Sequence, residues 1–449
     1  MTYVAHTPED TQEMLERIGV RSIEDLLKTI PENLRLTEPL AVGERLSEVE
    51  LTAHLEALAA QNAGPDRMVS FLGGGVYDHY VPAVVDFLAS RSEFYTAYTP
   101  YQPEVAQGTL QATYEFQSLI CRLTGMDAAN ASLYDGASAV AEAALVAISA
   151  TGRPGIIVSG TVNPRYREVL AGYTQGRAVA IECPSDRNGI SDSAAIVGKI
   201  TDQTACVIVQ SPNFFGQLED VSAIEQAVHR VSGLLIYAFS PIALGICRTP
   251  GEANADLAVG EGQPLGNPPN FGGPLLGLLA TRKEHVRRIP GRIVGRTVDE
   301  QGRPGYVMTL QTREQHIRRE KATSNICTAQ ALLATRAAIY MSLMGKSGFR
   351  ALAEVCTRRA HYLAEKISAV RGCALRYSGP FFNEFVVTCP LPAARVIASM
   401  SEHGIMPGID LAQFFPDRDR ELLVCVTEKH PPAQLDRYVE VLSQAVSAG

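Results

Sequence analysis

The chain has 449 residues, of which 46% are hydrophobic and 20% charged, with a formal net charge of -8. It is too long for one compact core and predicts about two or three domains. The acidic balance argues against nucleic acid or an anionic membrane as a partner, and no stretch of about 18 or more apolar residues could span a bilayer. The nine cysteines are scattered without a Cys-x-x-Cys pair, and the start lacks the apolar core of a secretory signal. This pattern fits a cytoplasmic protein with buried thiols better than disulfides or a metal site.

The first 65 residues predict a helical arm. Thr7 and Ser22 each precede an acidic stretch. A helix can begin there, because an N-cap hydroxyl accepts from a backbone N–H and acids favour the positive end of a helix. Residues 47–60 predict a third helix. These segments would bury little by themselves, so we expect them to pack on a larger body.

An aromatic loop lies near the start of the main body, which we expect to begin at Asp66. A triple glycine at 73–75 comes first; because no Gly-Lys-Ser/Thr follows it, it predicts a tight turn rather than a nucleotide-binding loop. Tyr95, Tyr98 and Tyr101 then stand close to two prolines, which exclude a regular helix. Such a loop is either a buried interface segment or a wall that faces a ligand.

Seven apolar segments between residues 130 and 280 alternate with helical segments. They are Ala131 to Tyr134, Ile156 to Ser159, Ala178 to Ile181, Ala205 to Val209, Leu234 to Phe239, Leu257 to Val259 and Leu275 to Ala280. Most are apolar throughout, which is typical of strands covered by helices on both faces. The alternation predicts a doubly wound α/β domain over residues 66–328 and leaves the strand order open.

Within this domain, the stretch Asp256 to Pro274 has the character of a cofactor site but no lysine. Its loop, Glu261 to Asn270, joins two buried strands and is rich in glycine, which lets a backbone lie close to a ligand. Neither Gln263 nor Pro264 can form an imine. At the first turn of the sheet, small residues at 136–138 open a helix whose N–H groups could hold a phosphate, although an unoccupied helix start would have the same sequence.

A basic segment leads out of this domain. Arg313, His316 and Lys321 lie in it with two further arginines, and the run ends in a Thr-Ser-Asn turn. A solvated helix face and a role in anion contact or at an interface both fit this pattern. Helices and strands then alternate to the C-terminus, which predicts a small α+β domain over residues 329–449.

The chain resembles the first (α) subunits of two-subunit glycine dehydrogenases (decarboxylating), the P-proteins of the glycine cleavage system. The resemblance rests on the strings FLGGGVYDHYVPAVV, YTAYTPYQPE, LTGMDAANASLYDGASA, VGEGQPLG with FGGP, and QTREQHIRREKATSNICT. They run through the chain in order, so the resemblance covers essentially all of it. It implies the aspartate-aminotransferase-like architecture, fold type I of the pyridoxal-phosphate enzymes, with an active site at a subunit interface.

The resemblance also gives the missing lysine a meaning. In this family the second (β) subunit carries pyridoxal phosphate on its own lysine, and the α subunit has the same fold without that lysine. Pro264 falls where the Schiff-base lysine would lie, and Phe239 and Ser240 stand where an acid would pair with the pyridinium nitrogen. These two losses imply a degenerate site with no covalently bound cofactor. The residues left as vestiges of a phosphate site are Gly136, Ala137 and Ser138.

The implied activity is the decarboxylation of glycine and the transfer of its aminomethyl group to the lipoyl arm of the H-protein. The chain would act with the second subunit, as two α and two β chains, and supply side chains across the interface. The candidates are Tyr95, Tyr98, Tyr101, Gln102, Arg313, His316, Lys321, Thr323 and Asn325. For each tyrosine the alternative is interface packing, and for each cation a surface charge.

Two other functions stay open at this point. The chain could be an autonomous pyridoxal-phosphate enzyme that uses a lysine elsewhere, of which Lys321 is the best placed. It could also be a non-enzymatic binding protein or scaffold built on an old enzyme fold.

Overall fold

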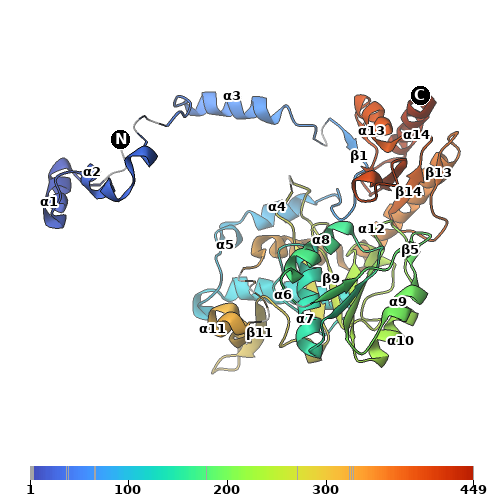
Figure 1. Cartoon of the computed structure of the whole chain (residues 1–449), viewed down its shortest axis with the longest axis horizontal. Helices are drawn as coiled ribbons and strands as arrows, with labels where there is room; N and C mark the ends of the chain where they lie inside the picture. The colour runs from blue at the N-terminus through green and yellow to red at the C-terminus, as the bar shows by residue number, and fades with distance from the viewer. Residues whose placement is uncertain are drawn as a thin grey trace. The chain divides into compact units, whose positions relative to one another are not determined.

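The computed structural model describes residues 5–36, 38, 40–64, 67–177, 179–270, 272–322, 324, 326 and 328–447. The chain divides into two compact units, Met1–Ala63 and Gly64–Gly449. Their helices and strands are labelled in Figure 1. Asp66, the expected start of the main body, lies outside the described residues, and the expected boundary at residue 328 stays a prediction.

The first unit is a set of short helices with little apolar burial. Its elements are α1 (Pro8–Ile18), α2 (Ile23–Leu26), η1 (Leu27–Thr29), η2 (Glu32–Leu34) and α3 (Glu48–Ala59). The hydroxyls of Thr7, Ser22 and Ser47 each accept from the backbone N–H three residues on, and the acid at that position bonds back. These capping boxes explain why the helices begin where the sequence predicted. Leu15 is buried, whereas Val49 is 80% exposed, so this unit has little core of its own.

Seven strands of the second unit form one sheet, in the order β2-β10-β9-β8-β7-β3-β4. They are β2 (Ala128–Ala129), β3 (Gly155–Val158), β4 (Ala180–Glu182), β7 (Thr204–Ser211), β8 (Leu234–Phe239), β9 (Leu257–Glu261) and β10 (Gly277–Thr281). The strands from β9 to β4 are parallel, and β10 pairs antiparallel with β9 and β2. The carboxyl ends of the parallel strands meet at one edge, where such sheets bind ligands.

Helices cover both faces of this sheet, as the apolar strands predicted. They are α6 (Gln107–Thr124), α7 (Gly136–Thr151), α8 (Pro164–Thr174), α9 (Ser193–Lys199), α10 (Ser222–Arg230) and α12 (Ala331–Ser368). In β8, Leu235 and Tyr237 enter the core shared with α6, α9, α10 and α12, while Ile236 and Ala238 enter the core under α7 and α8 (Figure 1). The split follows from the alternation of side chains along a strand.

Three details differ from the sequence-based expectations. The strand expected at Ala131 to Tyr134 lies earlier, at β2, because the chain turns at Ser132, whose φ is 108° and whose N–H donates to the Asn130 side chain. The connection after β10 contains a hairpin of β11 (Ile293–Val298) and β12 (Pro304–Thr309). The two helices expected between residues 329 and 370 meet at Gly345, whose φ of 57° kinks α12.

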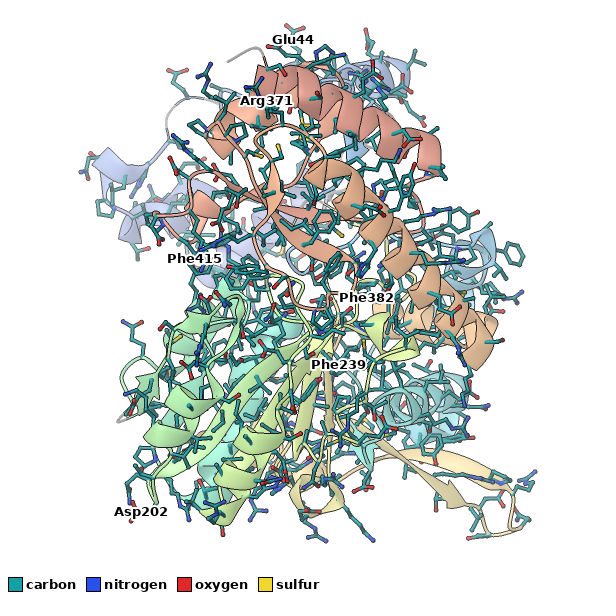
Figure 2. All side chains as sticks on the ribbon, turned by 90° about the vertical axis from the view of Figure 1, so that its right-hand side faces the viewer. Glu44, Asp202, Phe239, Arg371, Phe382 and Phe415 are labelled. Atoms are coloured by element: carbon teal, nitrogen blue, oxygen red, sulfur yellow. The ribbon has the colours of Figure 1, made fainter. Side chains whose placement is uncertain are left out.

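The C-terminal part forms a second, smaller sheet in the order β13-β14-β17-β16, as the predicted mixture of helices and strands requires. Its elements are β13 (Ala374–Leu375), β14 (Glu384–Thr388), α13 (Ala393–Glu402), β15 (Ile405–Met406), β16 (Ile409–Asp410), η8 (Leu411–Gln413), β17 (Glu421–Cys425) and α14 (Pro432–Ser447). Phe382, just before β14, shares a core with Phe239 of the large sheet, and Figure 2 shows both near the middle of the molecule.

The remaining elements connect these layers. They are β1 (Val69–Ser70), which pairs with β15, α4 (Ala83–Ala89), α5 (Ser92–Tyr95), η3 (Pro103–Val105), β5 (Asp186–Arg187), β6 (Ile190–Ser191), η4 (Ala243–Gly245), η5 (Lys283–His285), η6 (Gln311–Arg313), α11 (Gln315–Arg318) and η7 (Arg319–Lys321). Within the described part of the chain, no helix combines the length and the apolar character that crossing a bilayer requires.

Candidate functional site

A small polar cavity lies at the carboxyl end of the large sheet, where the sequence predicted a cofactor-like site. Its volume of about 20 Å³ leaves room for about one water molecule. The residues that line it are Gly75, Tyr77, Tyr166, Gln210, Pro212, Ala238, Phe239, Ser240, Pro241, Glu261, Asn383 and Glu384. Side chains from both sheets therefore fill the place where a ligand would be expected.

The carboxyl group of Glu261 occupies the start of α7. Its Oε2 accepts from the N–H of Gly136 at 2.9 Å, and its Oε1 accepts from the N–H groups of Gln263 at 2.8 Å and Leu276 at 2.9 Å. Asp135 caps the same helix by accepting from the Ser138 N–H at 2.7 Å. Burial raises the pKa of Glu261 to about 7, although the three N–H donors favour its charged form. The helix start that could hold a phosphate thus already has acceptors from this chain.

A second buried carboxyl group, Glu384, closes the cavity from the smaller sheet. Its Oε1 accepts from the Gly74 N–H at 2.7 Å and its Oε2 from the Tyr77 hydroxyl at 2.8 Å. Burial raises the pKa of Glu384 to about 7, although the hydrogen bonds from Gly74 and Tyr77 lower it. A Cβ at Gly73 would lie 2.2 Å from Glu384 Oε1, so only a glycine at this position lets the Glu384 side chain approach so closely.

The loop after β9 is fixed by Gln263. Its Oε1 accepts from the Tyr77 N–H at 2.8 Å, and its Nε2 donates to the carbonyls of Tyr77 at 3.0 Å and Asn267 at 2.6 Å. Pro264 is buried in this turn. Pyridoxal phosphate does not fit the residues present: the cavity is too small, the loop has no lysine, and Glu261 already accepts from the Gly136 N–H at the start of α7.

The aromatic loop lies on the surface. Tyr95, Tyr98 and Tyr101 are 69%, 82% and 56% exposed, and Gln102 is exposed as well. The hydroxyl of Tyr101 accepts from Nη2 of Arg292 at 3.2 Å, with the guanidinium 5.5 Å from the ring centroid. Rings at such a surface offer rigid apolar area with a polar tip, which suits contact with a second chain.

The structure brings the aromatic loop and the basic segment to one turn, residues 289–292. Arg313 donates to the carbonyls of Ile289 and Gly291, directly beside the Arg292 that contacts Tyr101. The sequence did not predict Arg292 as a site residue. It is one of several arginines in the connection after β10, and no sequence motif distinguishes it from the others. Arg292 is buried, with 9% of the residue exposed. This burial results from the packing of the turn against residues 130–132.

The other candidates of the basic segment do not join this turn. His316 is exposed and lies 3.5 Å from Glu314, and Lys321 is exposed and does not line the cavity. Thr323 and Asn325 lie outside the described residues, so their predicted interface role stays a prediction.

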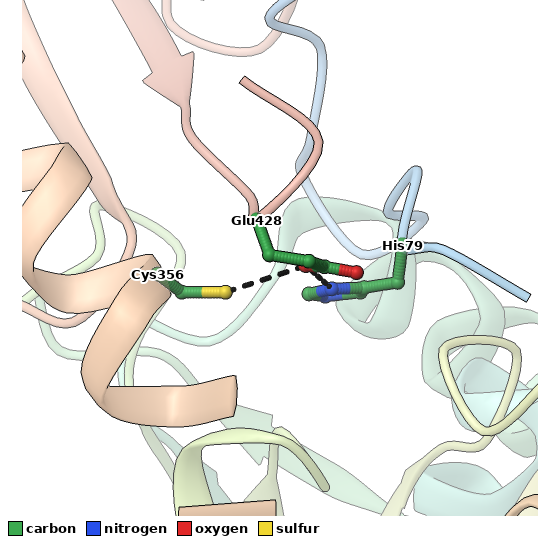
Figure 3. Close-up of side chains that lie close together, drawn as sticks. All are labelled: His79, Cys356 and Glu428. Carbon is green, nitrogen blue, oxygen red and sulfur yellow. Dashed lines mark hydrogen bonds and ion pairs between the residues drawn. The ribbon is translucent and has the colours of Figure 1, made fainter. Parts of the chain in front are cut away.

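One cluster of metal-binding residue types fastens the triple-glycine loop, residues 73–80. The ligand atoms of His79, Cys356 and Glu428 lie within 4.8 Å of one another (Figure 3). Glu428 Oε2 accepts from His79 Nδ1 at 2.7 Å and from the Cys356 thiol at 3.5 Å, and its Oε1 accepts from the Tyr80 N–H at 2.6 Å. Burial alone would raise the pKa of Glu428, but His79 and the N–H lower it to about 2. Because these side chains bond to one another, the cluster acts as a clamp that holds residues 79–80 against Glu428 rather than as an open metal site.

A second such cluster, Asp256, Glu284 and His285, lies at the opposite end of β9 from the cavity. Asp256 Oδ2 is already engaged by His229 Nε2 at 2.8 Å and by the Leu235 N–H at 2.7 Å. Asp256 therefore has its hydrogen bonds within the chain, whereas Nδ1 of His285 is buried without a hydrogen-bond partner.

The architecture is that of the fold type I pyridoxal-phosphate enzymes, as predicted. The chain superposes on a sphingosine-1-phosphate lyase from Burkholderia pseudomallei with a TM-score of 0.65, over 92% of this chain and 93% of that one, at 14% identity. A likeness at this identity shows the fold alone.

The family follows from nearer relatives. The family model for the glycine cleavage system P-protein matches residues 1–442. A probable glycine dehydrogenase (decarboxylating) subunit 1 from Chlorobium limicola is 51% identical over 444 residues, which are 99% of this chain and 100% of the relative. A crystal structure of glycine decarboxylase (P-protein) of the glycine cleavage system, in inhibitor-bound form, superposes with a TM-score of 0.89 at 41% identity, over 99% of this chain and 100% of that one. The chain belongs to the glycine cleavage system P-protein family.

Proposed function

We propose that the chain is the subunit of a cytoplasmic glycine dehydrogenase (decarboxylating) that carries no cofactor of its own. Together with a second subunit that holds pyridoxal phosphate, it decarboxylates glycine and passes the aminomethyl group to the lipoyl arm of the H-protein. The name subunit 1, which its relatives carry, supports a second subunit. The observation that supports the division of labour is Glu261, whose carboxyl group accepts from the Gly136 N–H at the start of α7 and from the N–H groups of Gln263 and Leu276.

The chain's own part is to complete the partner's site from across the interface. The Tyr98 side chain is 82% exposed, so its hydroxyl can donate to a phosphate or carboxylate of a second chain. The Tyr101 ring contacts Arg292, so a guanidinium lies beside the aromatic loop. Charged hydrogen bonds of this kind position an anion and favour charge that develops in a water-poor site.

Exchange of labelled bicarbonate into glycine tests the division of labour. With H-protein present, we expect exchange when this chain is mixed with its second subunit and none with either subunit alone. The expectation for this chain follows from the filled cavity and from the loop without lysine. Robust exchange by this chain by itself would refute the proposal.

Borohydride reduction in the presence of pyridoxal phosphate separates this function from that of an autonomous enzyme. We expect mass spectrometry to find no stoichiometric pyridoxyl-lysine in this chain and one in the second subunit. A stoichiometric adduct on Lys321 would instead establish the autonomous enzyme, despite the exposure of that residue.

A further inference from the structure

The smaller sheet contains two cysteines that face each other across neighbouring strands. β13 pairs antiparallel with β14, with Ala374 opposite Thr388 and Leu375 opposite Val387. The same register, continued by one residue, sets Cys373 opposite Cys389. Both cysteines are free and buried, with 7% and 2% of their surface exposed.

The hydrogen bonds around the pair define its type. Arg376 N–H donates to the Val386 carbonyl at 2.9 Å, and because hydrogen-bonded and non-hydrogen-bonded pairs alternate in an antiparallel ladder, Cys373 and Cys389 form a non-hydrogen-bonded pair. In agreement, the Cys389 N–H points the other way, to the Arg420 carbonyl beside β17, at 2.8 Å. Cα atoms in such pairs lie about 4.5 Å apart, within the range of about 4.4–6.8 Å that disulfides span.

The two side chains point to the same face and touch. Cys373, Cys389 and Val387 all belong to the core between the smaller sheet and α14. The two thiols lie near enough to interact, and their interaction lowers the pKa of Cys373 while it raises that of Cys389. Cys373 is 7% exposed and Cys389 is 2% exposed, so Cys373 is the thiol that a reagent reaches first.

We propose that Cys373 and Cys389 are a dithiol that a low-molecular-weight disulfide converts reversibly into an intramolecular disulfide. The Cys373 thiolate attacks one sulfur of the reagent and forms a mixed disulfide, and the first thiolate leaves and takes up a proton. Cys389 then gives up its proton and attacks the Cys373 sulfur, which releases the second thiol. The chain loses two electrons and two protons, and the reagent gains them.

The disulfide would secure β13, an edge strand of the smaller sheet. The β13–β14 ladder has two residue pairs, and Cys373 follows closely on the end of α12 at Ser368. A covalent link closes the loop between residues 373 and 389, which restricts the unfolded chain and opposes separation of the edge strand. The oxidised protein should therefore unfold at a higher temperature than the reduced one.

Treatment of the full chain with oxidised glutathione, followed by alkylation and peptide mapping, tests the proposal. The expected product is a cross-linked pair of peptides about 2 Da lighter than their sum, which dithiothreitol separates. Cys183 is exposed and serves as the internal control, because it should form a mixed disulfide with glutathione instead. The proposal is overturned if Cys183 is fully modified while Cys373 and Cys389 stay reduced or each carry glutathione.

The variants Cys389→Ala and Cys373→Ala provide the matched comparison. Each should abolish the cross-link and the rise in unfolding temperature on oxidation, with Cys183 still modified. A cross-link of the remaining cysteine to another site, or an equal rise in unfolding temperature in both variants, would contradict the assignment.

Discussion

Replacing Glu428 with glutamine should weaken the clamp that holds the triple-glycine loop, residues 73–80. The carboxylate accepts from His79, from the Cys356 thiol and from the Tyr80 N–H. An amide has one acceptor oxygen, so at least one of these donors would face an NH₂ group. The pKa of Glu428 falls from 4.5 to about 2 in the folded chain. At about 1.4 kcal/mol for each pKa unit, the charged form contributes about 3 kcal/mol to the free energy of unfolding.

The sign of the pH dependence follows from the lowered pKa. The contribution of Glu428 is fully present above its unfolded pKa of 4.5 and is lost as the pH falls from there toward about 2. Urea unfolding at about pH 7 should therefore show Glu428→Gln to be less stable by about 3 kcal/mol, and the gap should narrow toward about pH 3.

Glu354→Gln is the matched control for this experiment. Glu354 is exposed and pairs with Arg350 at 2.9 Å, so its change should alter the free energy of unfolding by less than about 0.5 kcal/mol. If Glu428→Gln is as stable as the parent at about pH 7, or if its deficit is the same at both pH values, the carboxylate does not hold the loop in the way that its contacts indicate.

Three further predictions address the cavity, the sheet and the interface. Burial raises the pKa of Glu261 to about 7, so the stability of Glu261→Gln relative to the parent should rise as the pH rises from about 4.5 to about 8. The assembled complex with this variant should retain glycine turnover. Lost turnover in an intact complex would show that the cavity is catalytic. Asp256 raises the pKa of His229, so the stability that His229 adds is fully present below about pH 6.5 and is lost as the pH rises through the folded pKa. The free energy of urea unfolding of His229→Gln should therefore vary less with pH than that of the parent. An unchanged pH profile would contradict a stabilising His229–Asp256 pair. Tyr95→Phe and Tyr98→Phe should slow glycine turnover by roughly tenfold to a hundredfold, and Tyr98→Ala by more, in complexes that assemble normally on gel filtration; full activity in both Phe variants would leave the tyrosines a packing role.

The layout of the large sheet could be predicted because local patterns carry it. β8 occupies the predicted residues without change, since six consecutive apolar residues are stable only where helices cover both faces. The capping residues Thr7, Ser22 and Ser47 fixed the helix starts for the same local reason. The hairpin of β11 and β12 was missed, because its residues alternate weakly and pair with each other rather than with the sheet.

The candidate site shows where sequence reasoning stops. The amino-acid sequence alone shows that no lysine lies near Pro264 and that no acid stands at Phe239 and Ser240. Nothing near Glu261 or Glu384 in the sequence marks them as the groups that fill the cavity. Their partners lie at Gly136 and Gly74, 125 and 310 residues away, and only folding brings them together.

The sequence by itself determined the fold class, the family and the loss of the residues that a cofactor would need, because each depends on local composition or on strings of adjacent residues. The tertiary structure decided which side chains fill the cavity, that Tyr101 and Arg313 each contact the turn 289–292, and that Cys373 faces Cys389. Such contacts depend on strand register and on packing between distant segments, which no local pattern encodes.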